Sequence, residues 1–247
     1  MSGSVNQRSL GPRSIAALAE RLVAWYERSA RDLPWRRTRD PYRIWVSEVM
    51  LQQTRVEAVV GRWERFLERF PTVEALARAE QAQVLAEWAG LGYYRRARQL
   101  HAAARQLVAT AQGQLPRDAA ELRLLPGFGH YTAGAVASIA FGQKAAAVDG
   151  NVERVVARLL ALEEDPKRGE TARQVRDFAT ALLRRADPRS LNQGLMELGA
   201  TICLPRGPRC GECPWGHACR ARRTGLPESF PRRAPRPETI AVASYAA

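Results

Sequence analysis

Glu48 is an acidic residue within an otherwise apolar segment, IWVSEVMLQQT, which covers residues 44–54. Residues three and four apart share one face of a helix, so we expect Glu48 to lie beside Ile44 and Leu51. Burial disfavours the charged form of a carboxyl group and raises its pKa, so that the group keeps a proton it can donate. The segment therefore indicates either a general acid or a buried glutamate that is satisfied by a structural partner.

The cysteines form a second group with chemical potential. Cys203, Cys210, Cys213 and Cys219 are the only cysteines, and their spacing is C-x6-C-x2-C-x5-C. Zinc sites usually carry two tight cysteine pairs, whereas this segment has one, so the spacing favours a 4Fe–4S cluster over zinc. The arginines around the cysteines fit either a loop that touches phosphates or an ordinary basic surface.

A glycine-containing connector and a second acidic residue follow along the chain. In LPGFGHYTAG, residues 125–134, Gly127 and Gly129 permit a tight turn and leave backbone N–H groups free at the start of the next helix. Such a helix end can bind a phosphate, although a plain helical connector is the alternative. Asp149 precedes another helix, and on its own it is predicted to cap that helix.

The elements that position these residues are predicted to be helical throughout. Apolar periodicity runs from residue 14 to about residue 198, with no convincing strand pair before residue 238, so the sequence predicts an all-α fold. Thr72 and Asp118 are placed to cap two of the helices. The predicted helices cover residues 15–28, 41–53, 58–69, 73–79, 81–88, 94–110, 119–124, 131–141, 150–162, 169–183 and 190–202.

The composition favours a globular protein with a polyanionic partner. Of 247 residues, 38 are basic and 25 acidic, which gives a formal charge of +13. This excess favours nucleic acid or an anionic membrane surface, although a coding bias towards arginine produces the same excess. No segment resembles a membrane span or a signal peptide, so we expect a cytoplasmic protein without a membrane partner, in which disulfides are disfavoured.

The last residues differ from the rest of the chain. Residues 224–238, TGLPESFPRRAPRPE, are rich in proline and arginine and are typical of a linker. The following TIAVASYAA is apolar and β-prone, but it has no strand to pair with. We expect that the chain was cut inside a further domain.

Five motifs in this order, SEVMLQQT, GLGYYRRAR, LPGFGHYTAG, AVDGNV and the four-cysteine loop, resemble the helix–hairpin–helix DNA glycosylases with an iron–sulfur loop. Within that superfamily the chain is most similar to the MutY-type adenine glycosylases, over roughly residues 33–219. The resemblance implies a six-helix barrel domain, 34–141, and an iron–sulfur cluster helical domain made of 8–33 and 142–223. Residues 224–247 would be a linker and the start of a C-terminal MutT-like domain.

The resemblance also implies a function. It implies a monomer that binds double-stranded DNA, carries a 4Fe–4S cluster and removes adenine mispaired with 8-oxoguanine or guanine by hydrolysing the N-glycosidic bond. Glu48 would protonate a purine ring nitrogen, and Asp149 would stabilise the oxocarbenium-like sugar, with Tyr131 and Asn151 nearby. The implied contacts with substrate or DNA are Trp35, Arg36, Gln52, Gln53, Leu91, Tyr93, Gly127, Gly129 and His130.

Two further expectations follow from the resemblance. Bifunctional relatives similar to endonuclease III carry a lysine where this chain has Tyr131, so we expect a monofunctional enzyme that leaves an abasic site. If the MutT-like domain is missing, the preference for 8-oxoguanine over guanine should weaken. The alternative functions are excision of thymine from G·T mispairs and a non-enzymatic iron–sulfur module that binds DNA or senses redox state.

Overall fold

A computed structural model of the chain describes residues 11–231. Every regular element within this range is helical, which confirms the predicted fold class. None of these helices combines the length and apolar character needed to cross a membrane. The β-prone segment after residue 238 lies outside the described range, as do residues 232–238 of the predicted linker. The helices are α1 (Pro12–Ser29), α2 (Pro41–Leu51), α3 (Val56–Arg69), α4 (Val73–Arg78), α5 (Gln81–Glu87), α6 (Arg95–Ala111), α7 (Ala119–Leu122), α8 (His130–Phe141), α9 (Gly150–Leu160), α10 (Gly169–Leu183), α11 (Pro188–Thr201) and α12 (Arg220–Arg223), with 3-10 turns at Pro34–Arg36 and Pro227–Ser229.

Side chains cap several of these helices at their first turn. The carboxylate of Asp40 accepts a hydrogen bond from the backbone N–H of Arg43, at 3.1 Å, and so defines the start of α2. Thr72 and Asp118 cap α4 and α7, as the sequence predicts. Each cap satisfies N–H groups that have no partner inside the helix. The cap at Asp40 therefore sets where the helix that contains Glu48 begins.

The structure ends α2 sooner than the sequence predicts. The helix was expected to reach residue 53, but it stops at Leu51, and Gln53 adopts a left-handed backbone with φ of 56°. Tyr93, just before α6, is also left-handed, with φ of 48°. Positive φ is uncommon for residues other than glycine, so these positions are held by their surroundings.

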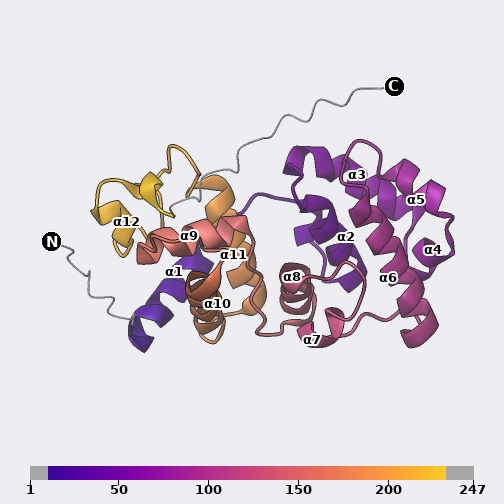
Figure 1. Ribbon diagram of the computed structural model, residues 1–247, viewed down its shortest axis with the longest axis horizontal. Coiled ribbons are helices and arrows are strands. Elements are labelled where there is room, and N and C mark those ends of the chain that lie inside the picture. The colour runs from indigo at the N-terminus through magenta and orange to yellow at the C-terminus, as the bar shows by residue number, and fades with distance from the viewer. Residues whose placement is uncertain (1–10, 232–247) are drawn as a thin grey trace, which may run out of the picture.

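Two large hydrophobic cores and a small third cluster, formed by Ile44, Ala135, Ile139 and Ala147, lie in the described part of the chain. The first lies among α2 to α8 and contains large aromatic side chains such as Trp45, Phe66 and Trp88. The second lies among α1, α9, α10 and α11, with Trp215 added from the segment after α11. Figure 1 shows these two groups of helices side by side, with α1 joined to the C-terminal helices. The predicted domains and their boundaries stay a prediction.

The segment that links the two cores is anchored by backbone contacts. Gly134 of α8 lies so close to this segment that a Cβ atom there would stand 2.2 Å from the carbonyl oxygen of Ala146. The buried side chain of Asn192 in α11 accepts from the N–H of Ala147, at 3.1 Å, and donates to the carbonyl of Ala145, at 2.8 Å. These contacts fix the path of the chain immediately before Asp149.

Candidate active site

The acidic residues singled out in the sequence meet in one cavity. Glu48, Tyr131, Asp149 and Asn151 line a cavity of about 160 Å³ that lies where α2, α8, α9 and α11 meet. Trp35 also forms part of this wall and is buried. Glu48 lies on α2, which packs in the first core, and Asp149 precedes α9, which packs in the second. The structure therefore brings the predicted catalytic residues together.

Glu48 is buried in the cavity wall and has a neutral partner. Its residue is 5% exposed, and its Oε2 accepts a hydrogen bond of 2.5 Å from the hydroxyl of Tyr131. Burial raises the pKa of Glu48 to about 7; the Tyr131 hydrogen bond and the charge of Arg36 oppose this rise, while the charge of Asp149 adds to it. A carboxyl group with this pKa can hold and donate a proton near neutral pH.

Asp149 serves as a helix cap and as a wall of the cavity at the same time. Its carboxylate accepts from the backbone N–H groups of Asn151 and Val152, at 3.0 and 2.9 Å, and from the side-chain amide of Asn151, at 2.8 Å. Burial raises the pKa of Asp149, and these hydrogen bonds to the ionised form work against the rise. The predicted capping role is confirmed, and Asp149 also lines the cavity that Glu48 lines.

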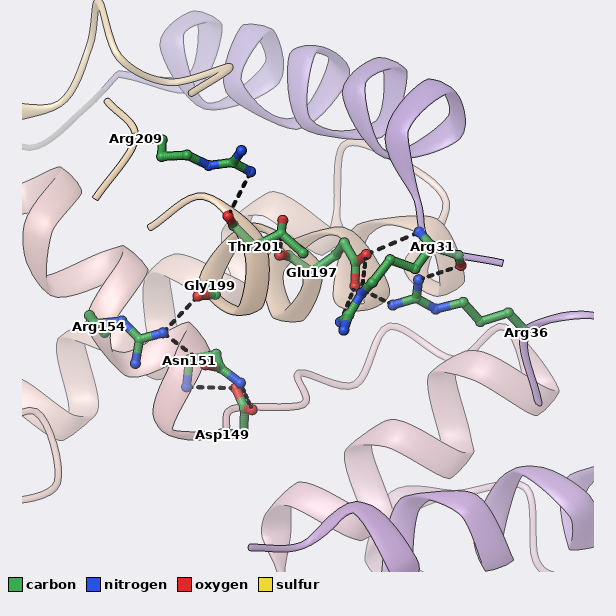
Figure 2. A network of polar contacts seen from close by, with 9 residues as sticks. All are labelled: Arg31, Arg36, Asp149, Asn151, Arg154, Glu197, Gly199, Thr201 and Arg209. Carbon is green, nitrogen blue, oxygen red and sulfur yellow. Dashed lines mark hydrogen bonds and ion pairs between the residues drawn. The ribbon is translucent and has the colours of Figure 1, made fainter. Parts of the chain in front are cut away.

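Arg154 extends this arrangement to the end of α11. Its guanidinium donates to the side-chain oxygen of Asn151 and to the carbonyl of Gly199, both at 2.8 Å, and its Nε donates to the carbonyl of Cys203 at 2.7 Å. Figure 2 shows Arg154 between the Asp149–Asn151 pair and α11. No sequence motif singles out Arg154, although its position three residues after Asn151 places both on one helix face.

A second buried carboxylate, Glu197 of α11, lines the same cavity and was also missed. Its oxygens accept from Arg31 Nε and Nη2, both at 2.8 Å, and from Arg36 Nη2, at 2.6 Å. Burial alone would raise the pKa of Glu197, but the hydrogen bonds from both arginines outweigh it and lower the pKa to about 2. Figure 2 shows both guanidinium groups converging on this carboxylate. Arg36, a predicted substrate contact, thus lines the cavity and forms an ion pair with Glu197.

A wider groove of about 850 Å³ opens beside the cavity and holds most of the predicted DNA contacts. Its lining includes Gln52, Gln53, Gly127, Gly129 and His130, together with Tyr131 and Asp149. Gly127 has φ of 79°, which a turn of this kind requires of glycine. Gly129 caps α8 with extended backbone, and His130 begins that helix at the surface.

Three of the predicted DNA contacts differ in how accessible their side chains are. Tyr93 is 60% exposed as a residue and is available to a partner. Leu91 is buried in the first core, so the structure does not bring its side chain to the groove. Gln52 is tied down, because its amide donates to the hydroxyl of Thr132 at 3.0 Å.

The four cysteines lie on the segment after α11 with their thiols free and partly buried. Burial raises the pKa of Cys213 to about 12, and the nearby thiols of Cys203, Cys219 and Cys210 add to the rise. Across residues 11–231, no group of three or more His, Cys, Asp or Glu side chains is placed so that it could hold a metal ion. The donors nevertheless fit an iron–sulfur cluster in their chemistry, since they are four thiols whose thiolate forms a cationic centre would favour.

Comparison with known proteins identifies a family and several similar proteins. Residues 46–180 match the HhH-GPD superfamily of base excision DNA repair proteins. The chain is 46% identical over 218 residues to the adenine DNA glycosylase of Homo sapiens, covering 85% of this chain and 40% of that protein. It is 44% identical over 228 residues to the adenine DNA glycosylase of Mycobacterium tuberculosis, covering 90% of this chain and 73% of that protein.

Solved structures agree on the fold. A thermostable thymine-DNA glycosylase is 29% identical, with a TM-score of 0.76 over 85% of this chain and 97% of that one. An endonuclease III–DNA complex has a TM-score of 0.71 at 24% identity, over 88% of this chain and 99% of that one. The chain spans only about two fifths of the human, rat and mouse relatives. The match over residues 46–180 and the mycobacterial relative establish the family: the chain belongs to the HhH-GPD superfamily of base excision DNA repair proteins and, within it, to the adenine DNA glycosylases.

Proposed function

We propose that this protein is a monofunctional adenine DNA glycosylase, which hydrolyses the N-glycosidic bond of adenine mispaired with 8-oxoguanine or guanine in double-stranded DNA. The observation that carries this proposal is that Glu48, with a pKa of about 7, and Asp149 line the same cavity. The adenine DNA glycosylases among its relatives support the choice of base.

Glu48 acts as the general acid in this proposal. Below pH 7 its carboxyl group is protonated and buried, with only a hydroxyl as partner, so it can transfer its proton to a ring nitrogen of adenine. The base then leaves in its neutral form. Because the Asp149 charge raises the pKa of Glu48, the second carboxylate also helps to keep the acid protonated.

Asp149 stabilises the cation that forms on the sugar. Three hydrogen bonds from Asn151 and Val152 hold its carboxylate and favour the ionised form. A carboxylate held in this way can stabilise an oxocarbenium-like sugar or form a transient covalent bond to it. The positive end of α9 contributes to the same preference for negative charge.

The wider groove receives the duplex around the extruded nucleotide. The hairpin residues Gly127, Gly129 and His130 offer the N-terminal end of α8 to a phosphate, and the net charge of +13 favours a polyanion. Extruding a base costs a few kcal/mol, and less for a mispair. Side chains that enter the stack, here Gln53 and Tyr93, offset part of that cost.

Water rather than an enzyme amine completes the reaction. Where bifunctional relatives hold a lysine, this chain has Tyr131, whose hydroxyl donates a hydrogen bond to Glu48. Lys144 and Lys167 are the only lysines, and Lys167 alone lines the wider groove. A Schiff-base step requires an amine at the reacting carbon, so the product of the proposed reaction is an abasic site.

The 4Fe–4S cluster is part of this proposal. Cys203, Cys210, Cys213 and Cys219 would hold it, and when bound it would supply a rigid crosslink for residues 203–219. The arginines of this segment would then be held in place to face phosphates. The purified protein should contain iron and inorganic sulfide and absorb visible light; a colourless, zinc-loaded protein would contradict this part.

Single-turnover base release tests the proposal. Duplexes with adenine opposite 8-oxoguanine, adenine opposite guanine and thymine opposite guanine are incubated with excess protein. We expect adenine from the first two and no thymine, because thymine has no purine nitrogen for Glu48 to protonate. The Asp149→Asn variant should release almost no base while still binding the mispair.

The thymine-DNA glycosylase among the structural neighbours makes the third duplex essential. Release of thymine without adenine would overturn the base assignment. Full turnover by Asp149→Asn would overturn the mechanism.

A further inference from the structure

Arg96 inserts its guanidinium beneath the end of α2, although it belongs to α6. Arg96 is buried, with 8% of its surface exposed. Nη1 donates to the carbonyl oxygens of Val49, at 3.0 Å, and Met50, at 2.9 Å, and also to the carbonyl of Gln52. These are among the last carbonyls of α2, which have no partner inside the helix. The last turn of α2 holds no basic residue, so Arg96 supplies the cation that a helix C-terminus favours.

The same guanidinium holds a second turn. Nη2 of Arg96 donates to the carbonyls of Leu91, at 3.1 Å, and Gly92, at 3.2 Å, and to the hydroxyl of Thr54, at 3.0 Å. Thus one side chain joins the turn after α2 to the turn before α6. Arg96 and Thr54 are 42 residues apart in sequence, so this side chain joins two distant parts of the chain.

Each of these turns carries one residue other than glycine with left-handed backbone. Gln53 has φ of 56° and Tyr93 has φ of 48°, and both directly follow a residue whose carbonyl is bonded to Arg96. Such backbone persists for non-glycine residues only where the surroundings fix it. The hydrogen bonds from Arg96 are placed to provide that constraint at both positions.

The guanidinium also supports the Tyr93 ring. The Arg96 Cζ lies 5.3 Å from the ring centroid of Tyr93 and 5.6 Å from that of the fully buried Trp88. Contacts of this kind between a guanidinium and an aromatic face are attractive. Tyr93 therefore has a cation close to its ring while most of the side chain remains exposed.

We propose that Arg96 is a positioning residue that fixes the spacing of Gln53 and Tyr93, so that both side chains are ready to enter the duplex beside the target base. This inference rests on the proposed glycosylase function. Lysine cannot replace arginine in this role, because one ammonium group cannot reach both turns as the two Nη atoms of a planar guanidinium do. Arg96 acts through Gln53 and Tyr93 and does not touch the substrate.

The test compares Arg96→Lys with wild type on two substrates. On the adenine·8-oxoguanine duplex we expect single-turnover base release to fall about 10- to 100-fold, as for misplaced groups near a reacting centre. Adenine opposite an abasic-site analogue needs less unpairing, so there we expect a loss below about threefold. Binding to undamaged duplex should not change. Arg62→Lys is the matched control, since Arg62 also donates to a loop carbonyl, that of Ala89 at 2.9 Å.

A double variant shows whether Arg96 works through the tyrosine. If it does, adding Arg96→Lys to Tyr93→Ala costs much less than Arg96→Lys alone. Fully additive losses, or equal losses on both substrates, would overturn the inference and leave Arg96 a purely structural residue. Should Arg96→Lys fail to fold in a thermal melt, Thr54→Val removes one contact of the guanidinium and should give a smaller loss with the same substrate dependence.

A binding measurement separates this inference from the proposed function. A 2-aminopurine beside the mispair brightens when its stacking is broken, and this signal needs no chemistry. If wild type releases no base from any duplex, the proposed function fails, yet the inference still predicts that wild type raises the fluorescence more than Arg96→Lys does. Equal fluorescence for the two proteins would contradict the inference.

Discussion

Two buried glutamates on the wall of one cavity differ in almost everything but their burial. Glu48 and Glu197 are 5% and 1% exposed, yet the pKa of Glu48 is raised to about 7 and that of Glu197 is lowered to about 2. Burial pushes both values upwards. Glu48 has a neutral hydroxyl as its hydrogen-bond partner, whereas Glu197 holds two guanidinium groups. The partner, and not the burial, therefore decides which acid keeps its proton.

The largest expected effect would come from Glu48→Gln, which keeps the shape and burial of the side chain but removes its acidic proton. Single-turnover release of adenine should fall by about 10²- to 10⁴-fold, the usual contribution of a general acid. Mispair binding and the thermal unfolding temperature should stay close to wild type. A variant that retains the wild-type rate would show that Glu48 is not the proton donor.

Glu197→Gln should act mainly on stability. Removing one partner of a buried ion pair leaves the other charge uncompensated, which costs about 3–5 kcal/mol. Denaturant unfolding of wild type and variant measures this difference in free energy of unfolding. Glu48→Gln is the matched comparison, because it removes a buried carboxyl group with no cationic partner. Equal destabilisation by both substitutions would break the distinction between the two acids.

The pH dependence of the free energy of unfolding should also reveal the ion pair of Glu197. The pKa of Glu197 in the folded protein lies below its ordinary value, so its contribution to stability is complete above that ordinary value and disappears as pH falls towards 2. A lowering of this size corresponds to about 3 kcal/mol. Glu197→Gln should remove this part of the pH dependence. Unfolding free energies measured from pH 6 down to pH 3 will decide, and parallel curves for the two proteins would count against the ion pair.

The smallest expected effect concerns Tyr131→Phe. The Glu48 group must be protonated to act, so base release should decline as pH rises above about 7. The Tyr131 hydrogen bond lowers the pKa of Glu48, and its loss should move the alkaline limb upwards by about one pH unit. A pH–rate profile of single-turnover release measures the limb. A downward shift would contradict the assignment of that limb to Glu48.

The sequence predicts helices well where the signals are local. Thr72, Asp118 and Asp149 cap helices in the structure as their positions indicate. The sequence predicts an end of α2 two residues too late, and in the structure the carbonyls at this end accept hydrogen bonds from Arg96 of another helix. The apolar periodicity of one segment cannot show that the guanidinium of a distant residue, here Arg96, binds the end of its helix.

The candidate site was predicted in part for a similar reason. The resemblance to glycosylases pointed to Glu48 and Asp149, and the structure brings them together. Glu197 sits in LMELGA, as apolar a setting as that of Glu48, and was missed because its partners Arg31 and Arg36 lie 166 and 161 residues away. The sequence shows an acid in an apolar helix; only tertiary structure shows whether a cation neutralises it.

The contact between Gly134 and Ala146 has a consequence for how this protein can change over evolutionary time. Side chains inside either core can exchange size with their neighbours and still fill the same volume. Backbone against backbone offers no such freedom, because a Cβ atom at position 134 would stand 2.2 Å from a carbonyl oxygen. The two cores can change in sequence while Glu48 and Asp149 keep their positions, whereas a side chain at position 134 would push the segment before Asp149 away from α8.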